Sequence, residues 1–135
     1  MRLLDTDVKI DLMRGLAPAI AWFESLGDEE APGLPGFVVM ELICGCRNRT
    51  ELNGLKERLR PFKIYWPREQ DLNQAMADLW TFRLSDGLKI LDTLIGRCAT
   101  GHGATLYTFN TKDFSLISGL KLEQPYSRSL PKLGN

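Results

Sequence analysis

Four acidic side chains in this sequence stand at positions that could build one metal site. Asp5 directly follows a short apolar run, Glu41 lies inside a longer apolar run, and Asp92 and Asp113 each stand where a helical pattern begins. In a parallel α/β sheet, strand ends and helix starts share the carboxyl edge, where ligands bind. We therefore expect these four residues, which are far apart in sequence, to converge at that edge.

Such a cluster needs a positive charge to be tolerated. Two carboxylates 4 Å apart repel each other by roughly 4 kcal/mol at an effective dielectric near 20. Around Glu41, no Lys or Arg stands three or four residues away. Because all-oxygen ligation suits hard cations, we expect one or two Mg²⁺ or Mn²⁺ ions. Ions about 3.5–4 Å apart can hold a scissile phosphate and activate water, which suits phosphodiester hydrolysis.

Each acid also has an ordinary structural explanation. Asp5 and Asp92 could cap the helices that follow them. Asp113 could form a cap or an Asx-turn. Glu41, which we place on the first turn of a helix, could be favoured there by the helix dipole. Only the joint placement of the four favours a metal site.

Short apolar runs alternate with helical patterns along the chain. This alternation predicts an α/β fold with a mainly parallel central sheet and helices on both faces. We expect one domain over residues 1–126 and a C-terminal tail over 127–135 with too little apolar content to pack. The predicted strands are 2–5, 37–39, 63–66, 104–108 and 120–122, and the predicted helices are 8–14, 17–26, 40–48, 51–59, 69–84, a helix from 92 to 101 or 103, and a short turn at 114–117.

The composition limits the classes of function. Lys plus Arg equals Asp plus Glu at 17 each, so no net charge draws the whole chain to nucleic acid. The segment 47–68 is locally basic, which fits either a phosphate-binding patch or a solvated helix face. We expect Cys44, Cys46 and Cys98 to be buried free thiols in a reducing cytoplasm. The start does not fit a signal peptide, and no apolar run approaches the ~20 residues of a membrane helix.

Four segments resemble, in order, the signature blocks of PIN-domain nucleases, and most of all the VapC-type toxins of toxin–antitoxin pairs. The resemblance covers about residues 2–126. It lies in L-L-D-T-D-V-K-I-D-L-M-R-G (3–15), V-V-M-E-L-I-C-G (38–45), L-D-T-L-I-G-R-C-A (91–99) and L-Y-T-F-N-T-K-D-F (106–114).

This resemblance implies a three-layer α/β/α sandwich and a Mg²⁺- or Mn²⁺-dependent endoribonuclease acting on RNA of the translation machinery. It also implies a homodimer and an inhibiting VapB-like antitoxin. The acidic quartet of the family falls on Asp5, Glu41, Asp92 and Asp113, which would be both the metal ligands and the catalytic residues. Second-shell or substrate-contacting positions near this quartet fall on Thr6, Asp7, Thr108 and Asn110.

Some positions depart from the family pattern, and other functions stay open. Asp7 stands where Asn or Ser is usual. Small residues, mostly Ala, are usual at the positions of Gly96, Arg97 and Cys98. We expect Arg97 to face solvent. One alternative is a catalytically silent RNA- or protein-binding module with the same fold. Another is a haloacid-dehalogenase-like phosphatase with Asp5 as nucleophile, although Lys9 stands where that motif has Thr or Val.

Overall fold

The computed structural model describes residues 1–28 and 31–128. Its strands are short and all pair in parallel, in the order β1-β4-β5 in one sheet and β2-β3 in a second. A bridge between Leu3 and Gly33 joins the two, so β2 continues the sheet beyond β1. The strands are β1 (Arg2–Leu4), β2 (Leu34–Pro35), β3 (Ile64–Tyr65), β4 (Thr105–Tyr107) and β5 (Lys121–Glu123).

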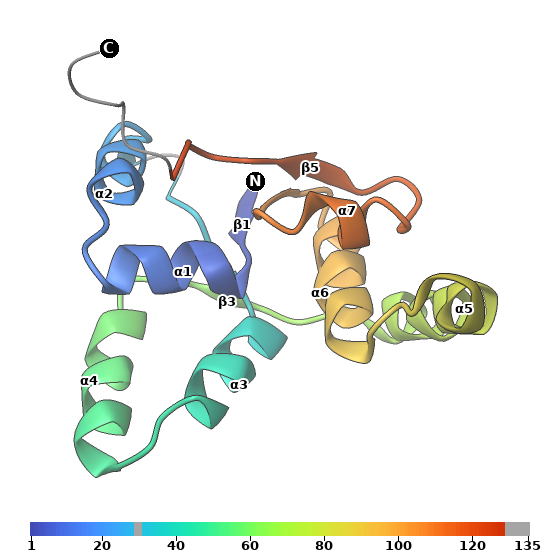
Figure 1. Ribbon diagram of the computed structural model, residues 1–135, viewed down its shortest axis with the longest axis horizontal. Coiled ribbons are helices and arrows are strands. Elements are labelled where there is room, and N and C mark those ends of the chain that lie inside the picture. Colours follow the sequence, from blue (N-terminus) through green and yellow to red (C-terminus); the bar gives the residue numbers. More distant parts are fainter. Residues whose placement is uncertain (29–30, 129–135) are drawn as a thin grey trace.

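Helices surround these strands in the α/β sandwich that the sequence predicts (Figure 1). α6 packs on β4, β2 and α3, while α5 lies outside it and packs on α6. α1 contacts α2 and α3 on the other side of the molecule. The helices are α1 (Thr6–Met13), α2 (Ala17–Glu24), α3 (Gly36–Cys44), α4 (Arg49–Leu59), α5 (Glu69–Asp86), α6 (Ile90–Gly101) and α7 (Thr111–Phe114).

The core lies between the central strands and the helices beside them. Leu3, Leu4, Leu106 and Phe114 are fully buried there. Gly96 lets α6 approach this layer, because a Cβ at that position would collide with the side chain of Ile117. The departure from the family pattern at residue 96 is therefore explained by close packing.

The predicted strand at 37–39 is wrong. Residues 37–39 belong to α3, and the strand is the dipeptide Leu34–Pro35, which comes before the predicted strand. A continuous apolar run cannot distinguish a buried strand from a buried helix. Val38, Val39 and Leu42 are buried at helical spacing, so the run is the inner face of a helix.

Several predicted element ends also move. α6 begins at Ile90 and α7 at Thr111, so Asp92 and Asp113 are third residues of their helices and cap neither. Cys44 is exposed and Cys46 half-buried, so the expectation of burial holds only for Cys98. The described helices include none long and apolar enough to cross a membrane. Residues 129–135, most of the predicted tail, lie outside the described residues, and the domain boundary stays a prediction.

Candidate active site

Asp5 stands at the carboxyl end of β1, where buried Leu3 and Leu4 fix its position in the sheet. Its carboxylate caps α1 by accepting the Thr6 N–H at 2.8 Å, and it also accepts the Thr108 hydroxyl at 2.7 Å. The pKa of Asp5 is raised to about 7, chiefly by burial and then by the charge of Asp7, with a smaller contribution from Asp92. The two hydrogen bonds act in the opposite direction.

Asp7 lies beside this group on the first turn of α1. Its carboxylate accepts the backbone N–H groups of Val8 at 2.7 Å and of Phe109 at 2.9 Å. Burial raises the pKa of Asp7, while these two hydrogen bonds and the positive charge of Arg128 oppose the rise. Asp7, the acid that departs from the family pattern, is therefore held in part by the backbone N–H of Phe109, 102 positions away in sequence.

The residues after β4 complete this part of the site. Thr108 is fully buried, and its hydroxyl accepts the Asn110 N–H at 2.9 Å while donating to Asp5. Asn110 is the N-cap residue of α7, which carries Asp113. The two small polar positions implied by the family resemblance thus join β1 to α7.

Glu41 reaches the site from α3 and accepts the Thr6 hydroxyl at 2.8 Å. It is the sixth residue of Gly36–Cys44, so its predicted place on the first helical turn is wrong. The error follows from the misplaced strand, because α3 begins four residues earlier than the sequence pattern suggests. Among the described residues, Glu41 has a hydroxyl partner and no basic one.

The pKa of Asp92 is affected by burial and by three of the other acids, Asp113, Glu41 and Asp7. Burial is the main cause that raises its pKa, and the charge of Asp113 is the next largest. Glu41 and Asp7 raise the pKa of Asp92 further, whereas Lys89 lowers it. These effects require the acids to be near one another, so residues between 5 and 113 are brought to one negatively charged region.

In the described part of the chain, none of the four predicted ligands forms a salt bridge with Lys or Arg. Their oxygens are the donors that hard divalent cations prefer. However, no three His, Cys, Asp or Glu side chains among residues 1–28 and 31–128 stand close enough to hold a metal ion. The donor chemistry fits a divalent ion, which would have to draw the carboxylates together against their mutual repulsion.

Two cavities meet at Glu41. One has a volume of about 970 Å³ and is bordered by Asp92 and Asn110 together with apolar residues of α5 and of the segment Leu88–Leu91. The other, of about 600 Å³, lies between α1, α3 and α4 and is bordered by Thr6 and Arg58. The acidic region is therefore open on two sides to a ligand larger than an ion.

Comparison with known proteins identifies this architecture. The sequence model of the PIN domain matches residues 2–120. The chain belongs to the PIN domain family. This PIN domain matches no curated protein. The family match confirms the resemblance and removes the phosphatase alternative, while the roles of individual residues stay predictions.

Solved structures with the same fold as this PIN domain are toxin–antitoxin complexes. A complex from Klebsiella pneumoniae is 27% identical with a TM-score of 0.72, over 93% of this chain and 98% of that chain. VapBC-1 from nontypeable Haemophilus influenzae is 22% identical with a TM-score of 0.73, over 90% and 96%. DNA-bound VapBC from Salmonella typhimurium is 21% identical with a TM-score of 0.75, over 90% and 96%.

Sequence reasoning missed two cations near the acids of this PIN domain. Lys89 acts on Asp92 and Arg128 acts on Asp7. Lys89 is the N-cap residue of α6, three positions before Asp92, so a correct helix start would have found it. Arg128 follows the last strand in a segment with no periodic pattern, and no sequence signal marks it.

Proposed function

We propose that this chain is a Mg²⁺- or Mn²⁺-dependent endoribonuclease, the toxin of a VapBC-type pair. The observation that supports this most strongly is the acidic region itself. Burial and the charges of neighbouring acids raise the pKa of Asp5 and of Asp92. None of the four predicted ligands has a basic partner within salt-bridge distance among the described residues. PIN domain toxins are generally nucleases, and the neighbouring solved structures are toxin–antitoxin complexes.

Asp5, Glu41, Asp92 and Asp113 would hold one or two ions. When bound, a divalent ion polarises a phosphate and lowers the pKa of an attacking water, so no protein nucleophile is required. Thr108 orients Asp5 and Thr6 orients Glu41 through the hydrogen bonds described above. Such bonds to ligand carboxylates fix their direction and tune their affinity for metal.

The substrate that we propose is RNA of the translation machinery, either tRNA or rRNA. Lys89 at the start of α6 could contact a phosphate beside Asp92. The basic segment 47–68 is a weaker candidate, because Arg47 is paired with Glu51 and Arg60 with Glu57. The free thiols Cys44, Cys46 and Cys98 fit a reducing compartment, and we place this activity in the cytoplasm.

A cognate VapB-like antitoxin is the inhibitor that we propose. The Klebsiella and Haemophilus structures are such complexes. The cavity between α1, α3 and α4 offers apolar Ile10, Met13 and Leu42 beside Arg14 and Arg58. An amphipathic peptide with acidic residues would fit this lining and would pass close to Glu41.

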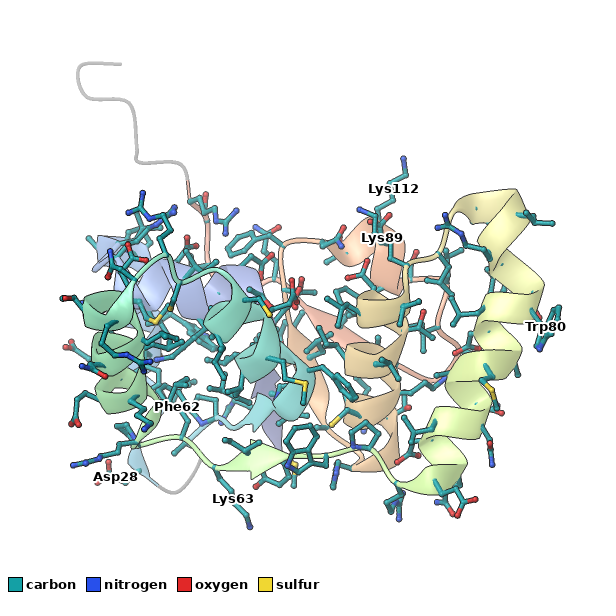
Figure 2. The ribbon with its side chains drawn as sticks, turned by 90° about the horizontal axis from the view of Figure 1, so that it is seen from below. Asp28, Phe62, Lys63, Trp80, Lys89 and Lys112 are labelled. Carbon is teal, nitrogen blue, oxygen red and sulfur yellow. The ribbon has the colours of Figure 1, made fainter. Side chains whose placement is uncertain are left out.

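We also propose a homodimer. On α5, exposed apolar side chains recur every four residues at Leu72, Met76, Trp80 and Leu84. Trp80 is 90% exposed and projects outward from the helix (Figure 2). A continuous exposed apolar stripe of this kind marks a protein interface. Sedimentation of the isolated chain tests this, and a monomer that persists at high concentration would contradict it.

Hydrolysis of structured RNA tests the proposed activity. We expect cleavage with Mg²⁺ or Mn²⁺, loss of cleavage with EDTA, and at least about a hundredfold loss in Asp5→Asn and Asp92→Asn, since a divalent ion carries the chemistry. Asp28→Asn is the matched control, because Asp28 is an exposed acid outside the cluster. RNA affinity without turnover would instead indicate a silent binding module, and cleavage that survives both EDTA and the two substitutions would refute the proposal.

A further inference from the structure

Phe109 links the candidate site to the segment that follows β5. On its inner side, its N–H donates to the Asp7 carboxylate at 2.9 Å. Its neighbour Thr108 donates to Asp5, and the Asn110 N–H returns to the Thr108 hydroxyl. The position of this one residue therefore affects how two of the acids are held.

The outer side of Phe109 is covered by two residues from beyond the last strand. The Tyr126 ring packs edge-on against Phe109 with 5.0 Å between centroids. The Arg128 guanidinium carbon lies 3.9 Å from the centroid of the Phe109 ring, a cation–π contact. After β5 the chain runs back toward α2 (Figure 1).

Both residues are tied to the same buried oxygen. The Tyr126 hydroxyl and the Arg128 Nε each donate to Oδ2 of Asp11 at 2.8 Å. Asp11 is only 8% exposed and belongs to α1, the helix that Asp5 caps. The segment after β5 is thus anchored to the helix that carries Asp7 and is stacked on the loop that carries Thr108.

We propose that Tyr126 and Arg128, anchored by Asp11, are positioning residues that clamp Phe109 and so hold Asp5 and Asp7 in place for metal binding. Neither residue contacts Asp5, so their effect on Asp5 would be indirect, through Phe109 and through the Asp11 anchor on α1. The clamp assigns a role to Arg128, which lies inside the segment that we predict as an unpacked tail. The inference rests on the proposed function in one respect, which is that the acidic region binds a divalent metal ion.

A purely electrostatic role of Arg128 and a positioning role predict opposite changes in cation affinity when Arg128 is removed. If Arg128 acted only as a positive charge near Asp7, its removal would strengthen the binding of a cation. If it positions Phe109, its removal weakens that binding, because the acids lose their support. Tyr126→Phe separates the two effects, because it removes one hydrogen bond to Asp11 and leaves every charge and the ring packing unchanged.

The experiment measures Mn²⁺ binding to the full chain without RNA, by electron paramagnetic resonance of the free ion, together with hydrogen exchange at the Phe109 amide. Groups that orient metal ligands typically change affinity 10–100-fold, so we expect Arg128→Met to weaken Mn²⁺ binding about tenfold. Tyr126→Phe should weaken it less and in the same direction. In both variants the Phe109 amide should exchange faster.

Tyr65→Phe and Arg60→Met are the matched controls. The Tyr65 hydroxyl forms no hydrogen bond to any described residue, and Arg60 forms an exposed ion pair with Glu57, so both should bind Mn²⁺ as the unmodified chain does. Unchanged or tighter binding by Arg128→Met, or unchanged Phe109 exchange in Tyr126→Phe, overturns the clamp. If the unmodified chain binds no Mn²⁺, the proposed metal centre fails, while amide exchange still decides whether Phe109 is clamped.

Discussion

Two aspartates of this PIN domain are equally buried, at 7% exposure each, and are treated differently by the fold. Asp78 on α5 receives a two-point ion pair from Arg97 on α6, with Nε and Nη2 at 2.6 and 2.7 Å from its oxygens. Asp5 receives two hydrogen bonds and no cation among the described residues, and its pKa is raised to about 7.

The contrast is between a carboxylate that an ion pair neutralises and one that we propose as a metal ligand. Burying a charge is costly unless it is paired, and Arg97 supplies that pairing for Asp78. It also donates to the Ser118 carbonyl at 3.2 Å, so it joins α5 and α6 to the turn before β5. No described residue neutralises Asp5 in this way, and at the carboxyl end of β1 this role would fall to the metal ion that we propose.

The largest loss of stability should come from removing the ion pair between Arg97 and Asp78. Arg97→Met leaves Asp78 buried and uncompensated, and we expect the free energy of unfolding to fall by about 3–5 kcal/mol. Urea denaturation measures it. Arg60→Met is the control, because exposed ion pairs contribute about 0–1 kcal/mol. A loss below about 1 kcal/mol for Arg97→Met would show that the pair does not stabilise α5 on α6.

The burial of Asp5 without a cation should affect how the stability of the fold depends on pH. Because the pKa of Asp5 is about 7 in the folded state against 3.8 as its reference, the folded state holds the proton more tightly. The free energy of unfolding should therefore fall as pH rises from about 4 to about 7, by at most about 4 kcal/mol, in the absence of metal.

Asp5→Asn should abolish this part of the pH dependence and should be more stable than the unmodified chain above pH 7. Denaturation in EDTA at pH 4 to 8 measures both. A variant with the same slope as the unmodified chain would place the titration on another group.

Added metal should offset the loss of stability that ionisation of buried Asp5 causes. An ion at a hundred times its dissociation constant stabilises the folded state by about 2.7 kcal/mol. We expect Mg²⁺ or Mn²⁺ to raise the melting temperature of the unmodified chain and of Asp28→Asn, and to leave that of Asp92→Asn unchanged. Equal stabilisation of all three would mean that the ion binds elsewhere.

The smallest effect should come from Thr108→Val, which keeps the side-chain shape and removes the hydroxyl. The substitution removes the hydrogen bond to Asp5 and the one from the Asn110 N–H, and each such bond contributes about 0.5–1.5 kcal/mol. The Thr108 hydroxyl also lowers the pKa of Asp5, so its loss should move the pH dependence to higher pH. Thr81→Val is the control, since the Thr81 hydroxyl bonds only to Ala77 on an exposed helix face. A pH profile identical to that of the unmodified chain would contradict the role of Thr108.

The comparison also shows what the sequence could reveal. The strands before Asp5 and Thr108 were predictable, because apolar runs end at each polar residue. The convergence of the acids was expected from the rule that parallel strands share one carboxyl edge. The start of α3 was not predictable, since the same apolar run suits a strand or a helix.

Specific pairs of side chains that lie far apart in sequence and outside this edge could not be inferred. We expected Arg97 to face solvent, which is wrong, because its partner Asp78 lies nineteen positions away on another helix. The contact of Arg128 with Phe109 has no local signal either. Helical spacing indicates which residues share a face, and it does not indicate which helix that face meets.

The order of strands in the sheet has a consequence for biosynthesis. β1 lies between β2 and β4, and the hydrogen bond from Thr108 to Asp5 spans 103 positions of sequence. A ribosome that has translated only as far as α6 has incorporated Asp5, Glu41 and Asp92 but neither Thr108 nor Asp113. A nascent chain of this kind cannot assemble the whole acidic region before the segment up to α7 has been translated.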